Sequence, residues 1–499
     1  MSQGHFIGGR WIEAGDTEFS STDPATGDVV WAGPMATKQE VNRAVYSARS
    51  AVENWASLPL EDRILYLKGF ARAVQGAREE LAETISLETG KPLWESLAEV
   101  DAMVAKVELT VSAYHERRSP VSLELGDTAG TIRYLPLGVL AVVGPFNMPG
   151  HIPNGHMVPA LLSGNTVVFK PSKYTPGVAE KTVALWEASG IPQGVVNLIQ
   201  GSREAGVHLV EHPDIDGLLF TGSYETGKAL HRLFAGRPEK TLAMEMGGNN
   251  PLVVFGVSDL DAAVVLTLLS AFLTSGQRCT CARRLIVEKG GVGDNFIDRL
   301  AEAVESVKMG PYTDRPEPFC GPVISEQMAV KLMSVQETLW EAGAKPIVKM
   351  RPEGSRKALL RPGLVDVTEV RERSDAEWFG PLLQVVRVPD FEAALQEANR
   401  TAYGLAAGLL SDSQELYERF SSQVRVGHMV WNRQTTGASG RLPFGGLRAS
   451  GNHCPSGYFA VDYCSDPVAS LEADRIKLPD RLPSGLDAIP REKKPAPGS

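Results

Sequence analysis

Apolar residues recur at helical spacing through much of the first hundred positions. Residues 37–40 (TKQE) have the spacing of a helix-capping box, and apolar side chains then follow at intervals of three and four residues. A second helix is predicted from Pro59 towards Thr89, with a stop at Gly90-Lys91-Pro92. Two short strand-like pieces, HFIGGRWIEA and GDVVWAG, precede both helices.

The pattern changes near residue 139, where short runs rich in Val and Ile begin to alternate with helical segments. Near-continuous apolar strands separated by helices indicate a parallel sheet that is covered on both faces. We therefore predict a doubly wound α/β domain, whose strands are GVLAVVG (138–144), NTVVFKP (165–171), GVVNLIQG (194–201), GLLFTG (217–222) and PLVVF (251–255).

A second α/β pattern follows residue 255. Residues 259–275 are apolar on nearly every side, which predicts a buried helix that ends at Gly276-Gln277-Arg278-Cys279. Residues 433–457 are dense in Gly and Ser and predict a long loop, and such loops inside compact domains are usually functional. Residues 481–499 are rich in Pro and charge and predict a disordered tail.

Composition and charge exclude several classes of protein. The 499 residues carry 50 Lys+Arg against 60 Asp+Glu, which leaves a formal net charge of −10. With 43% hydrophobic residues, the chain is an ordinary globular one and not a disordered or fibrous one. The acidic balance, without a basic stripe, argues against a nucleic-acid partner because that affinity depends on clustered Lys and Arg.

The cysteine count and the N-terminal sequence indicate in which cellular compartment the protein is expected. Five cysteines without a CxxC motif support neither a disulfide framework nor a metal site. The first residues lack the pattern of a signal peptide, and no run reaches the roughly 18 apolar residues that a membrane span needs. We expect a soluble cytoplasmic protein with no membrane partner.

A glycine-rich turn follows the strand at 217–222 and opens a helix. Glycines there let a phosphate approach the backbone, and the helix N-terminus offers N–H groups to it. The alternative is an ordinary strand-to-helix turn, since the segment is not GxGxxG. Its residues are Gly222, Ser223, Tyr224, Glu225, Thr226 and Gly227.

Cys279 lies beside Arg278 and close to Arg283 and Arg284. Positive charge lowers the pKa of a thiol and enriches the nucleophilic thiolate, so Cys279 is a candidate nucleophile. The alternative is a buried structural cysteine. On a strand, the side chain of Cys281 would point the opposite way.

Glu245 is an acid in an otherwise apolar and glycine-rich stretch, MEMGGNN. Removal from water raises the pKa of a carboxyl, so Glu245 is a candidate general base near neutral pH. The alternative is a paired or loop-exposed acid.

Nine short motifs follow one another along the chain in an order that resembles the aldehyde dehydrogenase superfamily, and they extend over nearly the whole chain. The motifs GHIPNGH (150–156), GQRCTCARR (276–284), SGNHCPSGYFAVDYC (450–464) and PVASLEAD (467–474) resemble most the subgroup that acts on N-succinylglutamate 5-semialdehyde in arginine catabolism. The general motifs are DPATG (23–27), ETGKP (88–92), GPFNMP (144–149), NTVVFKPS (165–172), FTGS (220–223), EMGGNNP (245–251), GQRC (276–279), EWFGP (377–381) and PFGG (443–446).

The resemblance implies a mechanism. Cys279 attacks the aldehyde carbon, the Asn147 amide and the Cys279 N–H hold the oxyanion, and Glu245 activates the water that hydrolyses the thioester. The expected reaction is NAD-dependent oxidation of N-succinyl-L-glutamate 5-semialdehyde to N-succinyl-L-glutamate. The alternative is an NAD(P)-dependent dehydrogenase of another semialdehyde or small aldehyde.

The resemblance also assigns the cofactor residues. Lys170 and Ser172 fall near the adenosine ribose, residues 222–227 near the pyrophosphate, and Glu377 and Phe379 near the nicotinamide ribose. The family commonly has Glu after NTVVFKPS, but this chain has Lys173. A cation cannot accept hydrogen bonds from ribose hydroxyls and suits a 2′-phosphate, so NAD is predicted and NADP stays open.

Two further sets of residues were weighed for binding. The substrate has two carboxylates, which favours a cationic pocket, yet Arg278, Arg441 and Arg448 are each interpreted as structural or surface residues. His151 and His156 are five positions apart and are assigned to packing or capping, and no metal is expected.

Other functions fit the residues less well. A thiol hydrolase would leave the cofactor motifs unexplained and has no histidine beside Cys279. Acyl transfer to a thiol such as coenzyme A is disfavoured by Glu245, and a non-catalytic protein by the presence of both Glu245 and Cys279.

The family pattern implies a Rossmann-type cofactor domain at 1–115 and 136–247 and an α/β catalytic domain at 248–460. A small β oligomerisation arm would pair 116–135 with 461–480. Its edge strands would need a partner subunit, which predicts a homodimer or a dimer of dimers.

Overall fold

The computed structural model describes residues 2–15, 17–126, 128–478 and 481–486. Contacts divide the chain into two units, which we describe separately. The first comprises Met1–Arg118 and Leu135–Asp466, and the second comprises Ser119–Tyr134 and Pro467–Ser499. Among the described residues, no helix combines the length and the apolar character that crossing a bilayer requires.

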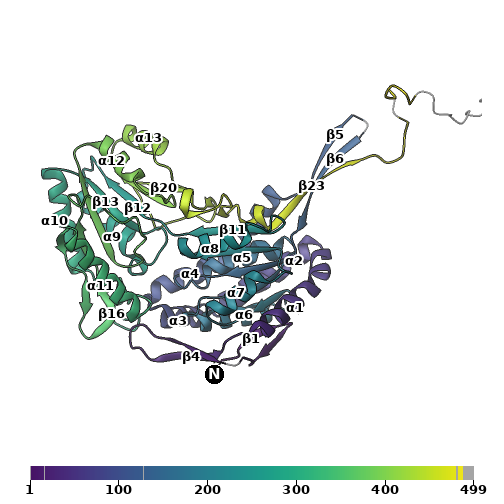
Figure 1. Ribbon diagram of the computed structural model, residues 1–499, viewed down its shortest axis with the longest axis horizontal. Helices are drawn as coiled ribbons and strands as arrows, with labels where there is room; N and C mark the ends of the chain where they lie inside the picture. Colours follow the sequence, from purple (N-terminus) through teal and green to yellow (C-terminus); the bar gives the residue numbers. More distant parts are fainter. Residues whose placement is uncertain (1, 16, 127, 479–480, 487–499) are drawn as a thin grey trace, which may run out of the picture. The chain divides into compact units, whose positions relative to one another are not determined.

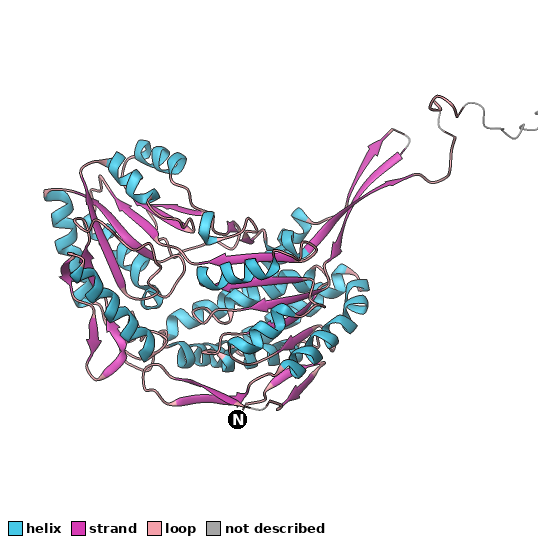
Figure 2. Ribbon diagram, viewed as in Figure 1, coloured by secondary structure: helices cyan, strands magenta, loops and turns pink. Residues whose placement is uncertain are grey.

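The first unit contains two seven-stranded sheets with helices packed against them (Figures 1 and 2). In one sheet the spatial order is β11-β10-β7-β8-β9-β1-β2. Its parallel strands are β7 (Val139–Val143), β8 (Thr166–Lys170), β9 (Val196–Leu198), β10 (Gly217–Gly222) and β11 (Thr241–Met246). The antiparallel strands β1 (His5–Ile7) and β2 (Arg10–Ile12) extend it.

This strand order confirms the doubly wound prediction for four of the five predicted strands. The fifth, at 251–255, was wrongly assigned to this sheet, because β12 (Asn250–Val254) pairs with β13 and β19 in the second sheet. The chain runs outwards from β7 through β8 to β9 and then returns to β10 on the other side of β7. Ligands of open α/β sheets bind at such a reversal, outside the carboxyl ends of the strands. The segments that leave β7 and β10 therefore begin at the natural binding crevice.

Helices cover both faces of this sheet. Buried side chains of α2, α4, α5 and α6 form one core, in which Phe70 and Trp186 stack with ring centroids 3.7 Å apart, and α1, α7 and α8 belong to the other. The bounds are α1 (Lys38–Ser57), α2 (Leu60–Gly76), α3 (Arg78–Thr89), α4 (Leu93–Arg117), α5 (His151–Leu162), α6 (Pro176–Ala188), α7 (Arg203–Glu211) and α8 (Tyr224–Phe234).

The predicted helix signals are partly right. The capping box forms, since the Thr37 N–H donates to the Glu40 carboxylate at 3.0 Å. The single helix predicted from Pro59 to Thr89 is wrong, because the chain breaks at Ala77 (ψ 18°) into α2 and α3. The weak helix former Gly76 ends the first piece, and Gly90, in the left-handed region, ends the second as expected.

The second sheet of this unit has the order β14-β17-β18-β13-β12-β19-β20. All neighbours pair in parallel except the edge strand β14. The strands are β12 (Asn250–Val254), β13 (Ala282–Glu288), β14 (Lys345–Val348), β17 (Gly363–Asp366), β18 (Leu382–Val388), β19 (Ala406–Leu410) and β20 (His428–Trp431). The helices are α9 (Leu260–Phe272), α10 (Gly291–Ser306), α11 (Glu326–Glu341), α12 (Phe391–Asn399) and α13 (Gln414–Gln423).

Small elements complete the first unit. The long loop predicted at 433–457 contains two short strands that pair with each other, β21 (Pro443–Phe444) and β22 (Ser456–Gly457). Two hairpins lie elsewhere, β3 (Glu18–Thr22) with β4 (Val29–Pro34) and β15 (Arg351–Glu353) with β16 (Arg356–Arg361). Three 3₁₀ turns span Leu273–Gly276, Arg448–Ser450 and Ala460–Cys464.

The second unit contains a three-stranded sheet of order β23-β6-β5. Its strands are β5 (Val121–Leu125), β6 (Thr128–Pro136) and β23 (Ser465–Glu472). Every residue of β5 is exposed, including Leu123 and Leu125, which leaves an apolar edge. Most of the predicted disordered tail, residues 487–499, lies outside the described residues, and the described part, 481–486, contains no helix or strand.

Candidate active site

The phosphate-binding turn predicted at 222–227 has the expected strand-to-helix context. Ser223 caps α8, and its hydroxyl accepts from the Thr226 N–H at 3.4 Å. A Cβ at Gly222 would lie 2.5 Å from the Phe220 ring, and one at Gly227 would lie 2.3 Å from the Met246 sulfur. Larger residues do not fit, so the glycines let α8 begin close against the sheet edge.

Lys170 is the last residue of β8, which neighbours β7, and Ser172 follows two positions later. The buried Lys170 ammonium donates to the Pro171 carbonyl at 2.7 Å, and burial lowers its pKa to about 8 with help from the Lys173 charge. The Ser172 hydroxyl accepts from the Tyr174 N–H at 3.3 Å. Lys173 is exposed, with its ammonium 5.1 Å from the Tyr174 ring centroid.

Cys279 lies on a turn between the helical segment and β13, and not at a helix end as predicted. α9 ends at Phe272, and Thr274 (φ 53°) and Ser275 (φ 54°) are in the left-handed region. Such residues cost about 1–3 kcal/mol each and persist only where other contacts hold them.

Contacts from distant segments hold this turn. The Glu95 carboxylate on α4 accepts from the Thr274 N–H at 3.1 Å and from its hydroxyl at 3.0 Å, and the Ser275 hydroxyl donates to the Gly321 carbonyl at 2.6 Å. The Asn250 amide donates to the carbonyls of Cys279 and Cys281 at 2.7 and 2.9 Å. Cys281 is therefore on the same turn and not on a strand.

The prediction that arginines lower the pKa of Cys279 is right only for Arg283, and burial outweighs its effect. Arg278 forms an ion pair with Glu95 at 2.7 Å, and Arg284 one with Glu397 at 3.4 Å, so both cations are balanced elsewhere. Burial, together with the charges of Glu377 and Glu245, raises the pKa of the Cys279 thiol to about 12, although Arg283 opposes the rise. The thiol is therefore protonated at neutral pH.

Glu245 has the environment that its sequence context predicts. Its side chain projects from β11 and is 6% exposed, and neither carboxylate oxygen accepts a hydrogen bond from a described residue. Burial raises its pKa to about 8, although Ser456 and the Gly446 N–H face the carboxylate and partly offset the rise. The carboxyl thus titrates near neutral pH.

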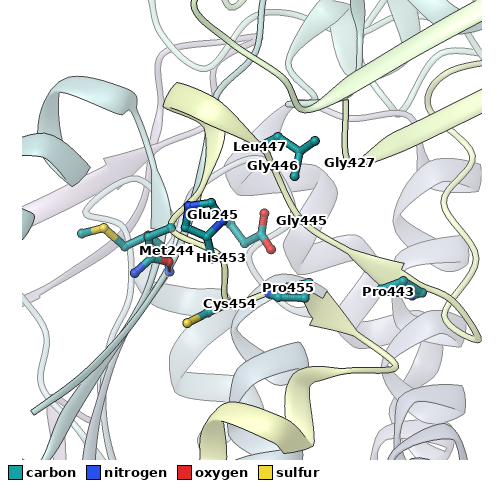
Figure 3. A pocket seen from close by; sticks show the side chains of 11 residues that line it. Met244, Glu245, Gly427, Pro443, Gly445, Gly446, Leu447, His453, Cys454 and Pro455 are labelled. Carbon is teal, nitrogen blue, oxygen red and sulfur yellow. Dashed lines mark hydrogen bonds between the residues drawn. The ribbon is translucent and has the colours of Figure 1, made fainter. Parts of the chain in front are cut away.

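A pocket of about 270 Å³ opens beside this carboxyl (Figure 3). Its walls come from β11, from the 443–447 segment and from the 452–455 segment. The Asn452 side chain accepts from the Met244 N–H at 2.9 Å and donates to the Leu242 carbonyl at 2.6 Å. The loop therefore pairs with the free edge of β11 and fixes the wall around Glu245.

Glu377 and Phe379 lie in the segment before β18. A Cβ at Gly247 would lie 1.8 Å from a Glu377 oxygen, and that carboxylate is 3.8 Å from the Arg283 guanidinium. Burial raises the pKa of Glu377 to about 7. The Phe379 ring lies 5.4 Å from that guanidinium and packs edge-on against Phe146 at 5.7 Å.

Phe146 and Tyr403 also belong to this region, although the sequence motifs assigned a role to neither of them, whereas Arg283 was expected near Cys279. The Tyr403 ring packs edge-on against Tyr224 of the glycine-rich turn, with centroids 5.8 Å apart. Phe146 lies in the GPFNMP motif, beside Asn147, which is buried in the segment between β7 and α5. The motif was the available signal for Phe146, whereas no sequence signal pointed to Tyr403, which lies far from Tyr224 along the chain.

The two histidines and the remaining arginines have structural surroundings. The His156 ring bonds the Tyr463 hydroxyl at 3.0 Å and the Thr221 hydroxyl at 3.1 Å, and burial lowers its pKa to about 3. Burial also lowers the pKa of His151, to about 4. The exposed Arg448 donates to the Thr401 carbonyl at 3.1 Å.

Cys279, Glu245, Glu377 and Arg283 therefore influence one another electrostatically where the carboxyl end of β11 in the first sheet faces the amino ends of β13 and β18 in the second. A family model described as "Aldehyde dehydrogenase family" matches residues 11–467. The chain belongs to the aldehyde dehydrogenase family. It is therefore an oxidoreductase that acts on aldehydes, as the sequence motifs predicted.

Relatives of this aldehyde dehydrogenase agree on family and fold. It is 52% identical over 481 residues to N-succinylglutamate 5-semialdehyde dehydrogenase of Pseudomonas fluorescens, covering 96% of this chain and 99% of that one. A betaine aldehyde dehydrogenase mutant of Staphylococcus aureus, in complex with NAD+ and with one cysteine modified, superposes with a TM-score of 0.90 at 28% identity, covering 97% and 98%. An NADP-dependent glyceraldehyde-3-phosphate dehydrogenase of Bacillus halodurans, complexed with NADP, gives 0.88 at 27% identity, covering 95% and 99%.

Proposed function

We propose that this enzyme oxidises N-succinyl-L-glutamate 5-semialdehyde to N-succinyl-L-glutamate with NAD, in arginine catabolism. The main support is that the charge of Glu245 affects the pKa of the Cys279 thiol, so the two groups lie close together. Glu245 is a buried carboxyl that makes no hydrogen bond of normal geometry to a described residue. The substrate is supported by the 52% identity to the Pseudomonas enzyme of that name.

The residues present fit a dinucleotide cofactor. The N-terminus of α8 meets the sheet edge at Gly222 and Gly227, where a Cβ would collide with neighbouring side chains, and N–H groups there suit a pyrophosphate. Lys170 and Ser172 would hold the adenosine ribose, and Glu377 and Phe379 would hold the nicotinamide end. When bound, oxidised nicotinamide supplies a hydride acceptor and a positive charge, and a positive charge beside a thiol lowers its pKa.

Cys279 is the proposed nucleophile. Its sulfur attacks the aldehyde carbon, and the Asn147 amide with the Cys279 N–H would stabilise the oxyanion that forms. One such donor contributes about 2.7–4 kcal/mol to the transition state. The Glu95 and Asn250 contacts orient the turn, so the sulfur is presented from a rigid backbone.

Glu245 is the proposed base for the second half of the reaction. Once the aldehyde carbon is oxidised, Cys279 carries a thioester, and Glu245 takes a proton from the water that attacks it. A pKa of about 8 places the carboxyl close to working pH, which is where a general base is most effective. Hydrolysis releases the carboxylate product and restores the thiol.

The choice of NAD over NADP is tested at one position. The exposed Lys173 ammonium leaves its charge available to a 2′-phosphate, which keeps NADP as the second candidate. Another semialdehyde or small aldehyde is the second candidate substrate, because Arg278 is already paired with Glu95.

The remaining proposals concern organisation. We assign 1–115 and 136–247 to cofactor binding, 248–460 to the nucleophile, and 116–135 with 461–480 to self-association as a homodimer or a dimer of dimers. The exposed apolar residues of β5 support an edge that pairs with another subunit. All five cysteines are free thiols, which supports a cytoplasmic location.

The test is formation of NADH and of NADPH from N-succinylglutamate 5-semialdehyde, with Cys279→Ala as the control variant. We expect turnover with NAD that disappears in the variant. Turnover with NADP alone would assign Lys173 to a 2′-phosphate. No turnover from folded protein with either cofactor would overturn the substrate, and a panel of semialdehydes compared by kcat/KM would then identify it.

A further inference from the structure

The peptide bond between Arg278 and Cys279 carries the backbone donor that the proposed mechanism needs. Its N–H, on Cys279, donates to no group among the described residues. Its carbonyl, on Arg278, accepts two hydrogen bonds, from the Arg283 guanidinium at 2.9 Å and from the Cys281 N–H at 3.0 Å. This peptide is therefore held by its oxygen, while its N–H stays available to an oxyanion.

Arg283 holds the same turn at a second point. The residue is 2% exposed and lies near the start of β13. Besides the Arg278 carbonyl, its guanidinium donates to the Gly276 carbonyl at 2.5 Å. Its Nε has no hydrogen-bond partner in the described part of the chain. Because the two carbonyls come from residues two positions apart, one guanidinium fixes the orientation of two peptide planes in the turn that leads to Cys279.

The positive charge of Arg283 strengthens its bond to the Arg278 carbonyl. Within the described chain its one ion pair is with Glu377, at 3.8 Å, so the charge is only loosely balanced. Hydrogen bonds from a charged donor are roughly twice as strong as neutral ones, and linked hydrogen bonds in a buried place polarise one another. The carbonyl and the N–H of a trans peptide point in opposite directions, so a donor that fixes the oxygen also fixes the direction of the Cys279 N–H.

We propose that Arg283 is a positioning residue of the oxyanion hole: its guanidinium, bonded to the Arg278 carbonyl, aims and polarises the Cys279 N–H that holds the developing oxyanion. Arg283 acts through this peptide and not on the substrate. The Cys281 N–H bonds the same carbonyl but carries no charge, so it polarises the peptide less. This inference rests on the proposed function, in which Cys279 is the nucleophile.

Two reactions of the same thiol separate this role from others. In acylation by p-nitrophenyl acetate, the Cys279 thiolate bonds the ester carbon, an oxyanion forms and collapses, and p-nitrophenolate leaves. In alkylation by iodoacetamide, a C–S bond forms as iodide leaves, and no oxyanion arises. Both rates depend on the amount of thiolate, so the ratio of acylation to alkylation cancels the thiolate and reports the oxyanion hole.

The experiment measures this ratio in the unmodified enzyme and in Arg283→Met, which replaces the guanidinium with an apolar side chain. We expect the ratio to fall at least about tenfold, since loss of one oxyanion donor costs about 10²–10³ in kcat and here the N–H remains without its orientation. Release of p-nitrophenolate follows acylation, and peptide mapping follows alkylation of Cys279. An equal fall of both rate constants would overturn the proposal, because Arg283 would then act only on the thiolate or on the fold.

Arg63→Met is the matched control. Arg63 is another buried arginine, 7% exposed, on α2. Its guanidinium donates to the carbonyls of Ala56, Leu58 and Leu162 at 2.6–3.1 Å. None of these carbonyls belongs to the turn that carries Cys279, so we expect this variant to keep the ratio of the unmodified enzyme. A similar fall of the ratio in Arg63→Met would overturn the assignment to Arg283.

A second variant covers the case in which Arg283→Met does not fold. Arg283→Lys keeps the buried charge, but its ammonium is a point charge and lacks the fork that bonds two carbonyls at once. We expect its ratio to fall as well, and a ratio equal to that of the unmodified enzyme would overturn the proposal. Neither probe needs NAD or the semialdehyde, so failure to oxidise the semialdehyde would overturn the proposed substrate and leave this test intact.

Discussion

The proposed nucleophile Cys279 and the proposed base Glu245 are held in place in opposite ways. The turn that carries Cys279 is bonded to Glu95, Gly321 and Asn250, which lie far from it in the sequence. The Glu245 carboxylate, by contrast, makes no hydrogen bond of normal geometry in the described part of the chain, where Ser456 and the Gly446 N–H face it. A nucleophile needs an exact position, whereas a base needs a free lone pair and a raised pKa.

The contrast extends to charge. Arg278 lies next to Cys279 in sequence, yet its positive charge is balanced by the ion pair with Glu95 and does not lower the pKa of the thiol. Burial is the largest influence on the pKa of Glu245, and no charge of a described residue is among the causes of its shift. The neighbouring residues in the sequence therefore failed to predict the direction of the Cys279 pKa shift, but they did predict that of Glu245.

The largest expected effect on turnover comes from replacing the Glu245 carboxylate, the proposed proton acceptor. Glu245→Gln keeps the shape of the side chain but cannot accept a proton, so steady-state turnover should fall by about 10²–10⁴-fold. Stopped-flow measurement of NADH should still show a burst, because Cys279 is intact. Loss of the burst together with turnover would mean that Glu245 also acts before hydrolysis.

A second variant breaks the support under Cys279. Glu95→Ala leaves the Arg278 charge without its partner and the strained Thr274 without its acceptor, so the free energy of unfolding should fall by about 3–5 kcal/mol. Glu80→Ala is the matched control, because its ion pair with Lys181 is exposed and should contribute less than about 1 kcal/mol. Urea unfolding of both variants measures the difference, and equal losses would contradict the assignment.

The smallest expected effect is a change of the hydrolysis rate with pH. Because Glu245 acts as a base only when deprotonated and its pKa is about 8, hydrolysis should rise about tenfold per pH unit below 8 and level off above it. The rate-pH profile of kcat checks this, and Glu245→Gln should lose that limb. A plateau that begins below pH 6 would show that Glu245 is solvated in the working enzyme.

The same pKa has a consequence for stability with a definite sign. Burial raises the Glu245 pKa from 4.5 to about 8, so between these values the folded state keeps a proton that the unfolded state has lost. The free energy of unfolding should therefore decrease as pH rises through this range, and by less in Glu245→Gln. Urea unfolding at several pH values provides the comparison.

Much of the fold could be predicted from the sequence because it depends on local patterns. Apolar runs separated by helices indicated parallel sheets, and Gly90 indicated the end of α3. The predicted helix from Pro59 to Thr89 was wrong because its apolar periodicity continues past Ala77, where the backbone breaks. Periodicity reports which face is buried and does not report whether the helix is continuous.

The candidate site divides in the same way. The sequence by itself determined the family to which the chain belongs, and it predicted which residues carry the chemistry, the thiol of Cys279 and the carboxyl of Glu245. Only the tertiary structure decided their charge states, because burial and ion pairs such as Arg278 with Glu95, which are 183 positions apart, depend on long-range packing.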